Sequence, residues 1–152
     1  MLWPINPYFP CYIFFTMKTT KTFLALSIAV ILASNAFAAA PVETLPSGVK
    51  VVHDVDGAGP QPKASDTVRV NYRGTLADGK EFDSSFKRGT PATFPLSRVV
   101  PCWTEGMQKI KVGGKATLTC PPATAYGERG AGGVVPPNAT LTFEVELLAI
   151  EK

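Results

Sequence analysis

The sequence offers few side chains that could serve as a nucleophile, a general base or a metal ligand. His53 is the only histidine in the 152 residues, and it lies in the strand-like run VKVVHDV, where a structural role is the commoner one. No serine occupies a nucleophile elbow, so a hydrolytic triad is not indicated. One histidine and two cysteines without close pairing do not make a zinc site. We therefore expect no metal and no cofactor.

A second candidate for chemistry is the glycine-rich stretch AYGERGAGGVVPPNATLTF, residues 125–143. A phosphate-binding loop needs Gly-x-x-x-x-Gly-Lys-Ser/Thr at the start of a helix. Here two valines, two prolines and a strand-like run follow the glycines, so no helix N-terminus is available. A plain linker also fits poorly, because Val134 and Val135 are apolar. A loop that folds over an apolar pocket accounts for both the glycines and the valines.

The N-terminal segment is typical of a secretory signal peptide over residues 17–38. From Met17 it carries two lysines, an apolar core over 23–33 and an A-x-A pattern that ends at Ala38. The core is shorter than the ~20 residues that a spanning helix needs, although an uncleaved anchor is the alternative. Residues 1–16 precede a complete signal, so we expect them to be a misassigned extension. The predicted location is the periplasm or the exterior.

Cleavage after Ala38 would leave a short linker, 39–48, and a single domain, 49–152. The removed part carries two of the 15 basic residues, Lys18 and Lys21, and none of the 12 acidic ones, so the formal net charge falls below +3. Such a balance indicates neither a nucleic-acid partner nor, after cleavage, a membrane surface.

Cys102 and Cys120 are the two cysteines of this domain. An even pair in an oxidising compartment favours a disulfide, which would contribute about 3 kcal/mol in the chain-entropy model. Alternation also places Cys120 on a buried face, where a free thiol is ordinary. Both states stay open, because a sequence does not give the separation of the two Cα atoms.

Short alternating runs between proline-rich connections predict a mostly β domain. DTVRVNYRG places Val68, Val70 and Tyr72 on one face, and the Asp78-Gly79 pair after it predicts a hairpin turn. KATLTC and TLTFEVELLAI alternate in the same way, whereas only CWTEGMQKIKVGG has helical spacing. We expect an α+β fold, a twisted antiparallel sheet of five to six strands wrapped around one short α-helix.

Two long segments resemble a known family. They are VNYRGTLADGKEFDSSFKRGTPATFPL and VVPCWTEGMQKIKVGGKATLTCPPATAYGERGAGGVVPPNATLTFEVELL. Over nearly all of residues 45–151 the chain is similar to FKBP-type peptidyl-prolyl cis-trans isomerase domains, in particular the exported bacterial branch of Mip-like and FkpA-like proteins. The resemblance implies a rotamase that accelerates X–Pro rotation during folding of exported proteins. Its partners would be proline-containing unfolded polypeptides, with macrolides such as rapamycin as pocket ligands. A non-catalytic chaperone or peptide-binding module with the same pocket is the alternative.

The resemblance also implies roles for individual residues. Asp83 and Tyr126 would be the catalytic polar groups at the mouth of an apolar pocket, and the backbone N–H of Val100 would donate to a substrate carbonyl. The implied substrate-binding residues are Tyr72, Phe82, Arg88, Val99, Val100, Trp103, Val134, Val135 and Phe143. Trp103 would form the floor, and Arg88 would pair with Asp83.

The chain departs from the family pattern at two positions and lacks one segment. Ala92 stands where many members have an aromatic residue, which would open one wall of the pocket. Ala131 replaces a bulkier residue seen in some members, which bears on ligand affinity at the flap. A helical dimerisation segment ahead of the domain is common in this branch, and its absence here predicts a monomer.

Overall fold

The computed structural model describes residues 41–151, which belong to one compact unit, Phe37–Lys152. The expected extension over 1–16 and the expected signal peptide over 17–38 lie outside the described residues. Within 41–151, no helix has the length and apolar character needed to cross a bilayer.

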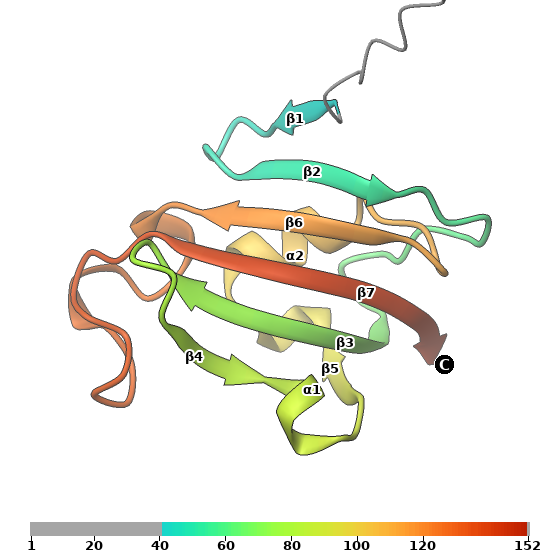
Figure 1. Cartoon of the computed structure of the whole chain (residues 1–152). Coiled ribbons are helices and arrows are strands. Elements are labelled where there is room, and N and C mark those ends of the chain that lie inside the picture. Colours follow the sequence, from blue (N-terminus) through green and yellow to red (C-terminus); the bar gives the residue numbers. More distant parts are fainter. Residues whose placement is uncertain (1–40, 152) are drawn as a thin grey trace, which may run out of the picture. The chain divides into compact units, whose positions relative to one another are not determined.

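A single sheet of seven antiparallel strands forms the domain (Figure 1). The strands are β1 (Val42–Thr44), β2 (Lys50–Val55), β3 (Thr67–Leu76), β4 (Glu81–Ser84), β5 (Ala92–Pro95), β6 (Lys115–Cys120) and β7 (Leu141–Glu151). Their order is β1-β2-β6-β7-β3-β4, and β5 pairs with β3. The α+β class is confirmed.

The sheet has seven strands where five to six were expected. β1 is three residues long and fully exposed, and β5 is four residues long and ends at a proline, so neither shows an alternation that a sequence could reveal. β1 nevertheless pairs with β2, and Leu45 just after it is buried in the core. The folded domain therefore begins inside the segment 39–48 that was expected to be a linker.

The alternation in the long strands predicted their buried faces correctly. In β3, Val68, Val70 and Tyr72 are buried, and in β7 the same holds for Phe143 and Val145. Tyr72 is opposite Val145 and Gly74 is opposite Phe143 in the antiparallel pairing of the two strands. Because β7 lies between β3 and β6, its side chains reach the centre of the core.

The Asp78-Gly79 turn joins β3 to β4 as expected. The N–H of Gly79 donates to the carbonyl of Leu76 at 2.9 Å, and the Asp78 carboxylate accepts from the N–H of Lys80 at 2.9 Å. Gly79 has a φ of 82°, which favours glycine.

The expected helix is α2 (Pro101–Met107), which lies against one face of the sheet (Figure 1). Proline suits the first position of the helix, because a backbone N–H there would have no partner within the helix and proline lacks one. Trp103 and Met107, four residues apart, are both buried. The helix ends before Ile110, which lies in the turn that follows and is also buried.

A second helix, α1 (Ser85–Arg88), was not expected. It is a single turn that the Ser84 side chain caps by accepting from the N–H of Lys87, and it ends at Gly89, which has a φ of 71°. One turn is too short to show helical spacing, so only its capping residues could have indicated it. Three short 3₁₀ helices connect the other elements: η1 (Leu96–Arg98), η2 (Pro122–Thr124) and η3 (Gly127–Arg129).

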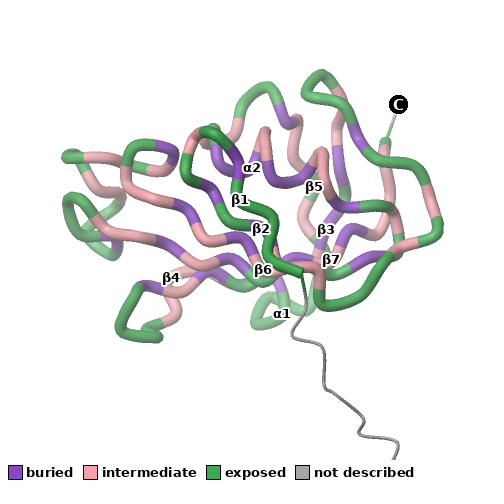
Figure 2. Tube along the Cα trace, turned by 90° about the horizontal axis from the view of Figure 1, so that it is seen from above, coloured by how far each residue is buried: buried purple, intermediate pink, exposed green. Residues whose placement is uncertain are grey.

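The core fills the space between the sheet and α2, and Figure 2 shows the buried segments running through these inner elements. A disulfide crosses it from Cys102, in the first turn of α2, to Cys120, the last residue of β6. The two Cα atoms are 5.6 Å apart, and both residues are fully buried. This bond fixes the start of α2 to the point where β6 leaves the sheet.

Candidate functional site

A cavity of about 330 Å³ opens between the sheet, α2 and the loops at their ends. Its lining residues are mostly aromatic or aliphatic, with three polar or charged side chains at the mouth besides Tyr72. They are Tyr72, Phe82, Asp83, Phe94, Arg98, Val99, Val100, Trp103, Tyr126 and Phe143. Eight of these ten residues were predicted to form the site.

Trp103 forms the floor of the cavity and is only 4% exposed. Three rings meet it edge to face, with centroid distances of 5.3 Å to Tyr72, 5.4 Å to Phe94 and 5.4 Å to Phe143. Such contacts add to the free energy gained by burying the rings and fix the orientation of each ring. The floor, defined here as these four rings, is therefore a rigid apolar surface.

The local sequence places Trp103 at this point. Val99 and Val100 line the cavity directly before α2, and the Thr104 hydroxyl donates to the carbonyl of Leu96 at 2.7 Å, which ties the helix to η1. The adjoining Cys102 ties it to β6. The indole Nε1–H of Trp103 is buried and has no hydrogen-bond partner within residues 41–151.

Gly74 permits the close packing of the neighbouring wall. A Cβ at this position would lie 2.6 Å from Cζ of Phe82 and 3.0 Å from Cε1 of Phe143. The two rings themselves meet edge to face at 5.6 Å. A side chain on this residue of β3 would therefore displace two pocket walls.

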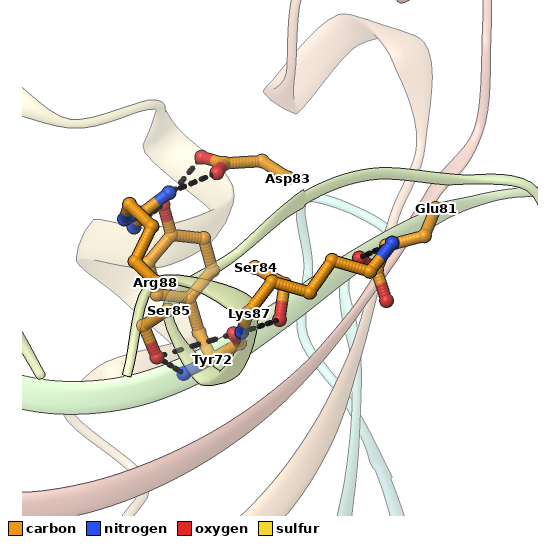
Figure 3. Close-up of polar contacts among 7 residues, drawn as sticks. All are labelled: Tyr72, Glu81, Asp83, Ser84, Ser85, Lys87 and Arg88. Carbon is orange, nitrogen blue, oxygen red and sulfur yellow. Dashed lines mark hydrogen bonds and ion pairs between the residues drawn. The ribbon is translucent and has the colours of Figure 1, made fainter. Parts of the chain in front are cut away.

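Polar side chains at the mouth form one connected group (Figure 3). The Tyr72 hydroxyl donates to the Asp83 carboxylate, and Arg88 forms an ion pair with the other oxygen of Asp83. Arg88 also donates from Nη2 to the Tyr72 hydroxyl at 2.9 Å, and its guanidinium lies 5.5 Å from the Tyr72 ring centre. On the other side, the N–H of Tyr72 donates to Ser85 Oγ at 2.8 Å. The group holds both Tyr72 and Asp83 in fixed positions.

These contacts set the protonation states. For Asp83, burial opposes ionisation, but the hydrogen bonds from Tyr72 and Arg88 outweigh it, so the pKa of Asp83 is lowered. Burial, together with the hydrogen bond to Asp83, raises the pKa of Tyr72. Asp83 is therefore a carboxylate and Tyr72 a neutral phenol near pH 7. Neither pKa lies where a general acid or base at neutral pH requires it.

Tyr126 lines the mouth from the loop between η2 and η3. Its side chain is 39% exposed, and no hydrogen bond to its hydroxyl occurs within residues 41–151. The hydroxyl is therefore available to a bound group. The backbone N–H of Val100 likewise has no acceptor among the described residues.

Three predicted residues do not line the cavity. Arg88 acts through Asp83 and Tyr72 rather than at the wall. Val134 is 49% exposed, and Val135 is buried in the core, where its carbonyl accepts from the N–H of Ala131 at 3.0 Å. The valine pair was expected to cover the pocket as a unit, whereas here the two side chains point to different environments.

Two lining residues were missed, Phe94 and Arg98. Phe94 lies two residues beyond Ala92 on β5, and its ring is 5.7 Å from that of Tyr72. The spacing of two could have indicated that the side of the strand carrying Ala92 also carries an aromatic ring. Nothing in the sequence placed Arg98, because it lies in a single 3₁₀ turn, which is too short to show a pattern of spacing.

The residues set aside on sequence grounds lie away from this site. His53 is half-buried in β2, opposite Ala116, and does not line the cavity. Within the described part of the chain, no group of three or more His, Cys, Asp or Glu side chains could hold a metal.

An open antiparallel sheet over one helix, with an aromatic cavity between them, defines the FKBP-like class of folds. The family model for FKBP-type peptidyl-prolyl cis-trans isomerases matches residues 59–148, and the chain belongs to this family. FkpA from Aeromonas hydrophila is 54% identical over 111 residues, which cover 73% of this chain and 41% of that protein. FkpA from Escherichia coli K12 is 58% identical over 95 residues, or 62% of this chain and 35% of that protein.

Solved structures agree with this assignment. The crystal structure of FkpA from Escherichia coli is 52% identical, with a TM-score of 0.70, over 72% of this chain and 51% of that one. A peptidyl-prolyl cis-trans isomerase from Pseudomonas syringae pv. tomato is 39% identical, with a TM-score of 0.69, over 73% and 81% of the two chains. The chain thus spans less than half the length of the two FkpA sequences and most of the shorter Pseudomonas chain.

Proposed function

We propose that this domain is a peptidyl-prolyl cis-trans isomerase that accelerates rotation of X–Pro bonds in unfolded or partly folded polypeptides. The observation that carries the proposal is the aromatic cavity of about 330 Å³ whose mouth carboxylate, Asp83, is already paired with Arg88 and accepts a hydrogen bond from Tyr72. Membership of the isomerase family supports it.

The reaction suits a pocket of this kind. Rotation about an X–Pro bond is opposed by amide resonance, with a barrier of ~18–20 kcal/mol. The twisted transition state has lost this resonance, so its carbonyl is less polar than that of the planar amide. An apolar, water-poor pocket favours the twisted form over the planar one, and no nucleophile is needed.

The roles of the residues follow from their positions. The prolyl ring would lie on Trp103, between the Phe82 and Phe143 walls. The Val100 N–H and the Tyr126 hydroxyl, both without a partner among the described residues, would hold carbonyls on either side of the rotating bond. Asp83 would act electrostatically and by holding Tyr72, not by proton transfer.

We further propose that the protein is exported, with residues 17–38 as a cleaved signal peptide. The signal pattern from Met17 supports this, and so does a fully buried disulfide, a bond that persists in oxidising compartments. The substrates would then be exported proteins during folding, and macrolides such as rapamycin would occupy the same cavity.

The test is isomerisation of a short Leu-Pro peptide, measured by NMR exchange without a coupling protease, with and without rapamycin. We expect acceleration that rapamycin abolishes, and a large loss in Tyr126→Phe combined with Asp83→Ala. Peptide binding without acceleration would instead favour a chaperone or binding module. Full activity in both single variants would show that apolar contact alone is sufficient.

A further inference from the structure

We propose that Arg98 makes the site select substrates that carry a carboxylate on a residue next to the proline. This inference deepens the proposed isomerase function and rests on it. The observation is a cationic side chain in the wall of the cavity that nothing else in the described structure neutralises.

Of the charges at the mouth, one has a partner and the other has none among the described residues. Asp83 and Arg98 are the two charged residues that line the cavity. The charge of Asp83 is balanced by its ion pair with Arg88 and by the hydrogen bond from Tyr72. No ion pair or side-chain hydrogen bond of Arg98 occurs within residues 41–151. A ligand at the mouth therefore meets one uncompensated positive charge.

The backbone holds Arg98 in place while its side chain stays exposed. Arg98 is the last residue of η1, whose first residue, Leu96, is fully buried. The N–H of Leu96 donates to the carbonyl of Asp66 at 2.9 Å, and its own carbonyl accepts from Thr104 at 2.7 Å. Val99 and Val100 follow directly, so the guanidinium extends from the segment that would bind the substrate backbone.

A guanidinium in this position suits a carboxylate. It presents five N–H donors in a planar fork that matches the two oxygens of an Asp or Glu side chain. Because Arg98 is exposed, water and salt screen the attraction. We therefore expect a preference of about two- to fivefold in kcat/KM at low salt, as for exposed ion pairs in general.

The experiment compares capped peptides that differ only in one side chain, Glu against Gln, placed either before or after the proline. Isomerisation is measured by NMR exchange, and peptide Kd by NMR titration of the same samples. We expect a higher kcat/KM and a lower Kd for Glu in at least one of the two placements. The ratio of kcat/KM for the Glu peptide to that for the Gln peptide should approach one in Arg98→Gln and fall below one in Arg98→Glu. In the wild type this ratio should shrink in high salt.

The matched control is Arg69→Gln, which removes the same charge from an exposed arginine of β3 that does not line the cavity. It should keep the wild-type ratio. An equal response to Glu and Gln in both placements, or a preference that survives Arg98→Gln, overturns the inference. Failure to accelerate any peptide contradicts the isomerase function alone, because the Kd ratio still decides whether Arg98 selects a carboxylate.

Discussion

The floor of the pocket and the glycine-rich loop beside it, residues 127–137, are held in different ways. The floor belongs to strands paired with their neighbours in the sheet and to a helix joined to β6 by a disulfide. The loop has one isolated bridge, from Ala131 to Val135, and four glycines with positive φ: Gly127, Gly130, Gly132 and Gly133. The stability of the domain should therefore depend on the floor, while the loop should mainly shape the mouth.

The largest difference should come from truncating Trp103 in the floor and Val134 in the loop. Trp103→Ala removes a buried ring that contacts three others, so we expect the free energy of unfolding to fall by about 3–5 kcal/mol. Val134→Ala, at a half-exposed side chain, should change it by no more than about 0.5 kcal/mol. Urea unfolding followed by circular dichroism measures the free energy of unfolding of both variants. Equal losses would contradict the claim that stability depends on the floor more than on the loop.

Removing the disulfide is the next largest change. The double variant Cys102→Ala, Cys120→Ala removes a crosslink between residues 18 positions apart, which should cost about 3 kcal/mol in the chain-entropy model. The urea midpoint of the wild type should fall on reduction, whereas that of the double variant should not respond to reductant. A reductant effect in both proteins would place its origin outside this bond.

Within the loop, two glycines with similar φ but different surroundings separate local strain from packing. Gly130 has a φ of 62°, and a Cβ there would lie 2.3 Å from the carbonyl oxygen of Val135. Gly133 has a φ of 69° and no atom near its Cβ position. Gly133→Ala should cost about 1–2 kcal/mol from φ alone.

Gly130→Ala should lose more stability than Gly133→Ala, because its Cβ would also push against Val135 and shift the bridge between Ala131 and Val135. It should also reduce isomerase activity, since Tyr126 directly precedes this loop. Thermal unfolding and kcat/KM for the two alanine variants decide this, and equal losses would mean that the bridge does not hold the loop.

The smallest effect on stability concerns the mouth and depends on pH. The pKa of Asp83 is lowered below its usual 3.8 in the folded state, so its stabilising contribution is fully present above that value. It is lost as the pH falls through the lowered pKa. Because Asp83 is 42% exposed and screened by solvent, the loss should be well below that of the three preceding changes.

Asp83→Asn isolates this contribution. The difference in unfolding free energy between wild type and Asp83→Asn should be constant near neutral pH and shrink in acid. Asp56→Asn, at an exposed aspartate, is the control. A difference that grows as the pH falls would contradict the lowered pKa.

The same two regions differ in how far the sequence predicted them. Alternation in β3 and β7 indicated that Tyr72 and Phe143 face the core, and helical spacing put Trp103 on the apolar side of a short helix. That Trp103 forms the pocket floor was implied only by the family resemblance. In these elements a regular backbone repeats the pattern of burial, so the side-chain types reveal it. The family resemblance then indicated the mouth residues Asp83 and Tyr126, which line the cavity as expected.

Irregular segments were predicted less well. Val134 and Val135 are adjacent and chemically identical, yet one is half-exposed and the other buried, because local backbone turns decide their directions. Arg98 reaches the cavity from a 3₁₀ turn in the same way. The single turn of α1 and the short strands β1 and β5 depend on tertiary pairing that no local pattern records.

We propose that the X–Pro bond of the substrate rotates on the floor formed around Trp103. NMR on a Leu-Pro peptide in exchange with the protein tests it directly, because exchange cross-peaks report cis-trans rotation and transferred nuclear Overhauser effects report contacts. We expect accelerated exchange together with contacts between the prolyl ring and the Trp103 indole. Accelerated exchange without those contacts, or the contacts without acceleration, would contradict it.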